Sequence, residues 1–395
     1  MSIQDLKRGY LALTVLNTLA ASYFFNYLFF FLHDRFGFGN RGNLWVSAMH
    51  GAVYVVSAWQ CGKFAQRRGL LNSLKIGFGS LALLMVVAGL LDSAAGVLCV
   101  FAVYSCVLLF TWPALEALTS EGETPAGVQY RVGLYNCTWS AAAALAYFTG
   151  GSLYECFGRG AVFWVPAGLF SCQLVLTFWL ARKAALGPTP ATESVHEPTP
   201  CSKEAAAGQG VRPAVFLKMA WLANPFSYVA LNTLLAVMPG VGDRLGLSPR
   251  EVGWFCSIWQ FGRLAAFIVL WRWTGWHYRF GWLLAAFLAL IASFILILMS
   301  VQIWLVVAAQ VFLGLASGLI YYSSLFYSMD AGDTKGEHGG LHEAFIGAGI
   351  FAGPAAGAAA LTLLPHSAHA ATWTVSGLLA IGLGGLVWLR LRHAK

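Results

Sequence analysis

About a dozen apolar stretches, each roughly 20 residues long, follow one another between residues 9 and 389 with short polar breaks. A bilayer core of ~30 Å is crossed by a helix of about that length. The segment at 281–300 (GWLLAAFLALIASFILILMS) contains no charged residue. Such a segment cannot form a water-facing helix, and it is too long for a strand in a protein core. The pattern therefore predicts an all-α protein that crosses a membrane many times.

The composition is that of a chain whose main solvent is a lipid bilayer, and it argues against nucleic acid as a partner. Hydrophobic residues make up 58% of the sequence and charged residues 10%, against about 25% charged residues in soluble domains. The formal net charge is +8, but the basic residues lie at the ends of the apolar stretches. That distribution indicates membrane orientation and not nucleic-acid binding. The 8 cysteines show no CxxC or CxxxH spacing, so we expect no metal and no cofactor.

The apolar stretches fall into two groups of six. The expected spans are 9–32, 43–62, 74–92, 95–119, 131–153, 160–182, 214–238, 252–272, 279–300, 302–328, 338–362 and 371–389. The predicted domains are a bundle at 1–182, a cytoplasmic linker at 183–213, rich in Pro, Ala and Thr, and a second bundle at 214–395. Lys and Arg concentrate in the loops that share a side with the N-terminus, so both termini are expected to be cytoplasmic.

The two groups of spans also resemble each other. Trp45 opens the second span as Trp254 opens the eighth, and residues 133–136 (GLYN) line up with residues 340–343 (GLHE). These short matches fall at equivalent positions, as parallel repeats about an axis normal to the membrane predict. The expected architecture is therefore two pseudo-symmetric bundles of six helices, about twelve transmembrane helices in all.

The loop after the second span carries a motif. Residues 62–71 (GKFAQRRGLL) resemble the pattern G-x-L-A-D-R-x-G-R-R of the major facilitator superfamily. The matching positions are Gly62, Ala65, Arg67 and Gly69. The resemblance implies a gate at this loop, although Gln66 replaces the acidic residue of the pattern and a generic basic loop remains the alternative. It also implies a bacterial secondary transporter that works as a monomer in the plasma (inner) membrane.

A second motif lies in the eleventh span. Residues 349–357 (GIFAGPAAG) resemble the GxxxGPxxG signature that antiporters of the same superfamily carry in their fifth helix. Small residues four apart let two helices approach closely, and a proline lets a helix bend. We interpret Gly353 and Pro354 as a packing and bending site with a conformational role.

Charges inside the spans are costly, and each is therefore a functional candidate. Arg263 lies near the middle of the eighth span, where it must meet a cavity, an acidic partner or an anionic solute. Glu343, beside His342, is the candidate for proton coupling, and a pair between Arg263 and Glu343 is the sharpest hypothesis. Structural roles, an ion pair for Arg263 and a helix entrance for Glu343, are the alternatives. Glu116 and His50 are further candidates for proton transfer.

In the superfamily the first, fourth, seventh and tenth helices line a central cavity, which suggests a substrate-binding set in this chain. With Arg263, the set comprises Tyr23, Asn26, Tyr27, Trp112, Tyr228, Asn232, Tyr321, Tyr322 and Ser324. Aromatic faces stack on rings, and amide and hydroxyl groups orient a polar solute. Tyr and Trp also form belts at membrane interfaces, and this reading stays open.

The leading hypothesis is a secondary active transporter that moves a small polar or anionic organic solute by alternating access, coupled to protons. No GxxxxGK[ST] loop is present, so this chain is not expected to pump with ATP. An exporter of amphipathic drugs or lipids is the nearest alternative, and a non-transporting membrane receptor or scaffold is an alternative of another class. An enzyme is not expected, since His342 and Glu343 are adjacent and point to different sides of their helix.

Overall fold

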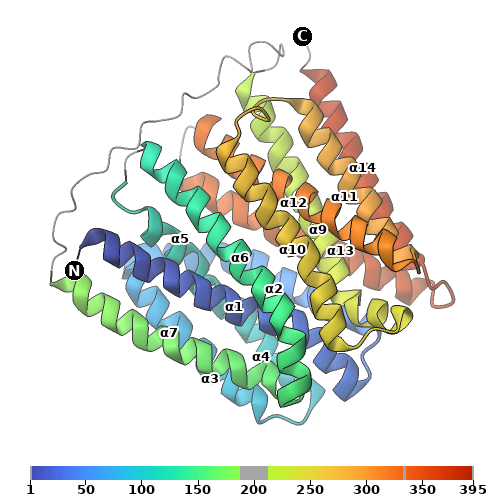
Figure 1. Ribbon diagram of the computed structural model, residues 1–395, viewed down its shortest axis with the longest axis horizontal. Coiled ribbons are helices and arrows are strands. Elements are labelled where there is room, and N and C mark those ends of the chain that lie inside the picture. Colours follow the sequence, from blue (N-terminus) through green and yellow to red (C-terminus); the bar gives the residue numbers. More distant parts are fainter. Residues whose placement is uncertain (1, 124, 187–211, 332–334, 394–395) are drawn as a thin grey trace. The chain divides into compact units, whose positions relative to one another are not determined.

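The computed structural model describes residues 2–123, 125–186, 212–331 and 335–393. Figure 1 follows its helices along the chain. They are α1 (Ile3–Phe36), α2 (Asn40–Arg68), α3 (Leu70–Gly89), α4 (Ala94–Val107), the 3-10 turn η1 (Leu108–Phe110), α5 (Trp112–Ser120), α6 (Pro125–Phe157), α7 (Ala161–Ala185), α9 (Pro213–Leu245), α10 (Pro249–Arg272), α11 (Phe280–Met299), α12 (Ile303–Ala331), α13 (Lys335–Leu363) and α14 (Ala370–Arg392). The all-helical prediction is confirmed.

Ten segments of the described chain are long and apolar enough to cross a membrane. α2 and α6, which contain the predicted spans 43–62 and 131–153, are not among the ten. They are 29 and 33 residues long, but polar residues interrupt their sequences. The fourth predicted span is interrupted: the 3-10 turn η1 separates α4 from α5, and Pro113 lies in the first turn of α5. Proline is tolerated there because the first turn of a helix does not use its N–H groups.

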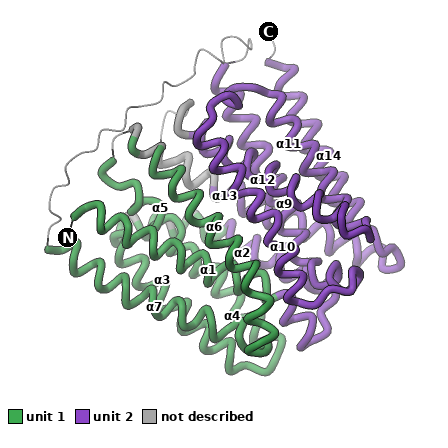
Figure 2. The backbone as a smooth tube through the Cα atoms, in the orientation of Figure 1, with its two compact units in different colours: residues 1–28, 56–200 green, residues 29–55, 201–395 purple. Residues whose placement is uncertain are grey.

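Contacts divide the chain into two compact units, which Figure 2 colours separately. Unit 1 comprises Met1–Leu28 and Val56–Pro200, and unit 2 comprises Phe29–Val55 and Cys201–Lys395. The end of α1 and the first half of α2 therefore belong with the C-terminal helices. The linker predicted at 183–213 lies mostly outside the described residues, so the predicted domain boundary stays a prediction.

An aromatic core holds unit 1 together. The Phe24 ring of α1 lies 4.6 Å from the Tyr104 ring and 5.9 Å from the Phe101 ring of α4, both edge-on. Phe24, Phe101 and Tyr104 are fully buried, and α3 packs along α7 in the same unit. Edge-to-face aromatic pairs of this kind stabilise a core beyond the area that they bury.

Glycines bring the helices of unit 2 into close contact. A Cβ on Gly314 of α12 would collide with the backbone carbonyl oxygen of Trp259 in α10. It would also lie 2.9 Å from the backbone nitrogen of Arg263 in the same helix. α10 and α12 thus pack with their backbones in contact, which only small residues allow. α9 ends at Leu245 and is capped by Gly246, whose φ of 66° is a left-handed conformation that glycine favours. Ser248 and Glu251 then start α10 with a capping box.

Candidate functional site

A partly buried hydrogen bond between distant parts of the sequence marks the candidate site in unit 2. The Tyr54 hydroxyl of α2 donates to Glu343 Oε2 of α13 at 2.5 Å. Tyr54 is buried, and Glu343 is the first residue of the apolar span of α13. A hydroxyl that donates to a carboxylate makes a charge-assisted bond, which is stronger than one between neutral groups.

Three predicted residues lie around this hydrogen bond. The Tyr228 ring of α9 lies 6.5 Å from the Tyr321 ring of α12, edge-on. Tyr228 lies close enough to Glu343 and Arg263 to interact electrostatically with both. Tyr54 interacts in the same way with Tyr228 and Tyr321. The structure therefore gathers four residues that the sequence singled out, Arg263, Glu343, Tyr228 and Tyr321, around a fifth that it did not, Tyr54.

Arg263 is buried in α10 with its guanidinium 4.8 Å from the centre of the Trp259 ring. The flat cation over an aromatic face gains cation–π attraction, which grows when both groups are out of water. The neighbouring Gln260 is also buried, and its side-chain oxygen has no hydrogen-bond partner among the described residues. This part of α10 thus carries two buried polar side chains, those of Arg263 and Gln260.

The remaining predicted residues of unit 2 have other neighbours. The Tyr322 ring lies 5.9 Å from both Phe267 and Trp276, in an aromatic group at the α10–α11 connection. Asn232 donates to the Tyr228 carbonyl oxygen at 3.1 Å within α9. Ser324 is buried, and its carbonyl oxygen accepts a hydrogen bond from Ser328.

The two predicted histidines differ in what the structure describes. The His50 ring lies edge-on 5.9 Å from the Tyr54 ring, one turn earlier on α2. The side chain of His342 lies outside the described residues. His50 therefore lies next to the site, and the role predicted for His342 stays a prediction.

The predicted residues of unit 1 form a second polar and aromatic group. The Tyr23 and Tyr27 rings lie 5.2 Å apart, and Tyr27 donates to the Tyr147 carbonyl oxygen at 3.0 Å. Asn26 is fully buried, and both of its amide atoms lack a hydrogen-bond partner among the described residues. Buried amides are almost always paired, so Asn26 departs from the usual pattern, and its predicted contact with a solute stays a prediction. Trp112 and Glu116 lie half-buried on α5.

The motif at 62–71 spans the junction of α2 and α3. Gly62 and Arg67 lie in α2, with Arg67 exposed, and the Gln66 side chain is outside the described residues. Gly69 is the N-cap of α3 with φ of 91°. This backbone conformation favours glycine, which explains why glycine occupies this position of the motif.

The motif at 349–357 faces α9. A Cβ on Gly349 would lie 2.8 Å from Tyr228 Cβ, and one on Gly353 would lie 2.7 Å from Thr233 Oγ1. Pro354 follows inside α13. The two glycines therefore make a close helix crossing and set Tyr228 against α13.

An ion cluster in unit 1 was not anticipated from the sequence. The Glu123 carboxylate accepts from Lys7 Nζ at 2.5 Å and from Arg131 Nε at 2.8 Å. Burial raises the pKa of the Glu123 carboxyl, but the hydrogen bonds from Lys7 and Arg131 outweigh this and hold the pKa below its ordinary value of 4.5. All three residues lie near ends of predicted spans, and no local pattern links them.

Tyr54, in the unit 2 site, was also not selected from the sequence. The sequence offered one weak indication of it, since Tyr54 lies four residues after His50 on the same helix face.

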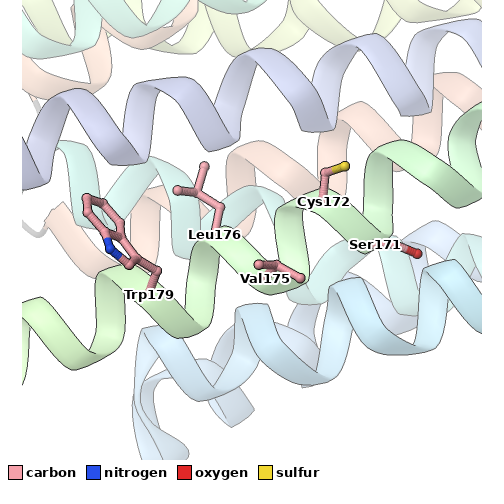
Figure 3. Close-up of a pocket in the computed structure, with 5 residues that line it drawn as sticks. All are labelled: Ser171, Cys172, Val175, Leu176 and Trp179. Atoms are coloured by element: carbon pink, nitrogen blue, oxygen red, sulfur yellow. The ribbon is translucent and has the colours of Figure 1, made fainter.

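An open pocket of about 490 Å³ lies on α7 in unit 1 and shares no residue with the predicted set. Its lining side chains are Ser171, Cys172, Val175, Leu176 and Trp179, which Figure 3 shows along one helix. A face of this kind suits lipid tails. Within the part of the chain that is described, no group of three His, Cys, Asp or Glu side chains could hold a metal ion.

Neither a protein-family model nor a curated protein matches the sequence. Solved transporter structures are similar to its fold. The nucleoside transporter NupG matches with a TM-score of 0.66 and 12% identity over 98% of both chains. The human organic anion transporter MFSD10 matches with a TM-score of 0.67 and 14% identity over 98% of this chain and 100% of its own. The POT family transporter PepTSo matches with a TM-score of 0.73 and 12% identity over 98% of both chains. The predicted fold, that of the major facilitator superfamily, is confirmed, and ten described segments are long and apolar enough to cross a membrane.

Proposed function

We propose that this protein is a secondary active transporter of a small polar or anionic organic solute, coupled to protons, and not an enzyme. The observation that carries the proposal is the placement around Tyr228 of the buried Arg263 and of Glu343, the first residue of an apolar span, in one unit. Charges inside a membrane protein are retained at a cost in desolvation, so they are expected where a solute or ion passes. The structures with the same fold include transporters of nucleosides and of organic anions, which are solutes of this size and polarity.

The two charged residues have different roles in this proposal. Arg263 cannot lose its proton, so it serves as a fixed positive charge for an anionic group of the solute. Glu343 can gain and lose a proton, because low-dielectric surroundings disfavour a charged carboxyl group. Tyr228 and Tyr321 supply aromatic faces and hydroxyl groups that would orient the solute. Asn26, Tyr23 and Tyr27 are proposed as solute-binding residues of unit 1.

The test is a thermal-shift screen of the purified protein against nucleosides, organic acids, sugars, amino acids and amphipathic drugs at two pH values. A bound ligand stabilises the folded state by mass action. Stabilisation by small anions that disappears in Arg263→Ala supports the proposal, and Arg263→Lys should weaken it because a bidentate contact is lost. Stabilisation by amphipathic compounds alone would contradict the proposal and favour the exporter.

Uptake into liposomes then tests coupling. The solute found in the screen should accumulate when an inward proton gradient is imposed, and Glu343→Gln should abolish this accumulation while gradient-free exchange persists. Accumulation by Glu343→Gln at the parent rate would contradict the coupling assignment. We also propose the plasma (inner) membrane as the location, with both termini cytoplasmic, protons and solute as partners, and a monomer as the working unit.

A further inference from the structure

The contacts of residues 29–55 point to a second role for the Tyr54–Glu343 hydrogen bond. This segment, the end of α1 and the first half of α2, precedes the linker by more than a hundred residues in the sequence but packs within unit 2. His33 Nε2 lies 3.3 Å from Asp243 Oδ2 at the end of α9. A Cβ on Gly240 would lie 3.1 Å from the side-chain carbon of Asn40, at the start of α2.

The first half of α2 follows α13 in an antiparallel register, which we call the α2–α13 seam. A Cβ on Gly357 would lie 3.3 Å from Leu44 Cδ1, and one on Gly51 would lie 2.6 Å from the Ile350 carbonyl carbon. A Cβ on Gly347 would lie 2.9 Å from Val55 Cγ2. The backbones meet at Gly51, and Leu44 and Val55 contribute apolar side chains to the contact. The Tyr54–Glu343 hydrogen bond lies at the Val55 end of the seam, where the part of α2 that belongs to unit 2 ends.

We propose that the Tyr54–Glu343 hydrogen bond is a proton-sensitive latch that holds the α2–α13 seam closed. The inference deepens the proposed function, on which it rests, by adding Tyr54 as the residue through which the proton on Glu343 acts on the helices. With Glu343 charged, Tyr54 donates to a carboxylate, and the bond is charge-assisted. When Glu343 gains a proton, its oxygens become neutral acceptors and the bond loses roughly half its strength. The seam then opens more often.

Titratable groups lie around the Tyr54–Glu343 hydrogen bond on several helices of unit 2. They are His50 and Tyr54 on α2, Tyr228 on α9, Tyr321 on α12 and, through Tyr228, Arg263 on α10. α14, which packs on α13, carries its basic residues in its last turn, at Arg390 and Arg392. Among the groups whose side chains are described there, only His50 would also titrate near neutral pH at its ordinary pKa. The side chain of the adjacent His342 lies outside the described residues. The test must therefore separate Glu343 from His50.

The experiment measures a distance across the seam, because a distance does not depend on the pH of a labelling reaction. Arg41, near the start of α2, and Leu364, directly after the end of α13, are both exposed at the end of the seam far from Tyr54. Both residues are changed to cysteine in the full chain, with the natural cysteines replaced, and are spin-labelled. The distance between the two labels is then measured in nanodiscs by pulsed electron paramagnetic resonance at pH 7.5 and 5.5. The fraction with a long distance should rise about fivefold on acidification, the factor for a difference of about 1 kcal/mol between the two hydrogen bonds.

Tyr54→Phe should give the high fraction at both pH values, because the donor is gone while the ring remains. Tyr54→Leu provides a second variant if the first does not purify. Tyr104→Phe is the matched control, since it removes a buried hydroxyl in unit 1 and should respond to pH as the parent does. A parent-like pH response in both Tyr54 variants would overturn the latch.

Two further variants separate the latch from the proposed function. Glu343→Gln should remove the pH response and His50→Gln should keep it. If Glu343→Gln removes the response while the Tyr54 variants keep it, the latch is wrong and the coupling role of Glu343 survives. If Glu343→Gln retains the response, or His50→Gln removes it, the titrating group is another residue, and both the latch and the coupling assignment are wrong.

Discussion

Replacing Glu123 by glutamine should destabilise unit 1 through the loss of two charge-assisted hydrogen bonds. The Glu123 carboxylate lies 2.5 Å from Lys7 Nζ and 2.8 Å from Arg131 Nε. The Lys7 side chain is 7% exposed, so Glu123→Gln leaves a buried ammonium group without its countercharge. Breaking a buried pair costs about 3–5 kcal/mol and losing a surface pair about 0–1 kcal/mol. Because the Glu123 side chain is 21% exposed, we expect a loss of about 2–3 kcal/mol.

This loss is measured as the melting temperature of the purified protein at pH 7, followed by an intrinsic tryptophan signal. A shift of about 2–4 °C per kcal/mol is usual for a folded unit of this size. Glu121→Gln is the matched control, since Glu121 is an exposed carboxylate two residues away. The double variant Lys7→Met with Glu123→Gln should recover part of the loss, because the buried charge is removed together with its partner.

The pH dependence of the same variant has a definite sign. The pKa of Glu123 is lower in the folded protein than its ordinary value of 4.5. The carboxylate therefore contributes stability above pH 4.5, and this contribution is lost as the pH falls below 4.5 through the folded-state pKa. The difference between parent and Glu123→Gln should accordingly be full at pH 7 and shrink in strongly acidic buffer. Equal melting temperatures of parent and variant at pH 7 would refute the reasoning, as would additive losses in the double variant.

Two further predictions concern packing. Gly314→Val should lower the melting temperature, because its side chain would collide with the Trp259 carbonyl oxygen and overpacking costs about 1–3 kcal/mol. Gly377→Val on α14, where a Cβ meets open space, is the control, and equal effects of the two would contradict the close crossing of α10 and α12. Tyr104→Phe should leave the melting temperature unchanged or raise it, since the buried Tyr104 hydroxyl has no partner among the described residues. A clear drop would show that this hydroxyl is bonded.

Local features of the sequence were enough to establish the fold class. The length of each apolar stretch is set by the thickness of the bilayer, and basic residues at span ends set the expected orientation, so neither depends on which helices touch. Arg263 and Glu343 could be selected in the same way, because a charge within an apolar stretch is unusual wherever its helix packs. The turn at Gly69 is also local, since its backbone conformation favours glycine.

Only the tertiary structure decided which residues meet. Tyr54 and Glu343 are separated by 289 positions, and Lys7 and Glu123 by 116. Neither pair follows from helical periodicity, which relates residues three or four apart on one helix. The grouping of residues 29–55 with the C-terminal helices was equally invisible, although α2 is one continuous helix. Side-chain partners across helices depend on crossing angle and register, and in membranes these are set by close contacts of small residues such as Gly51 and Gly347 rather than by hydrophobic pattern.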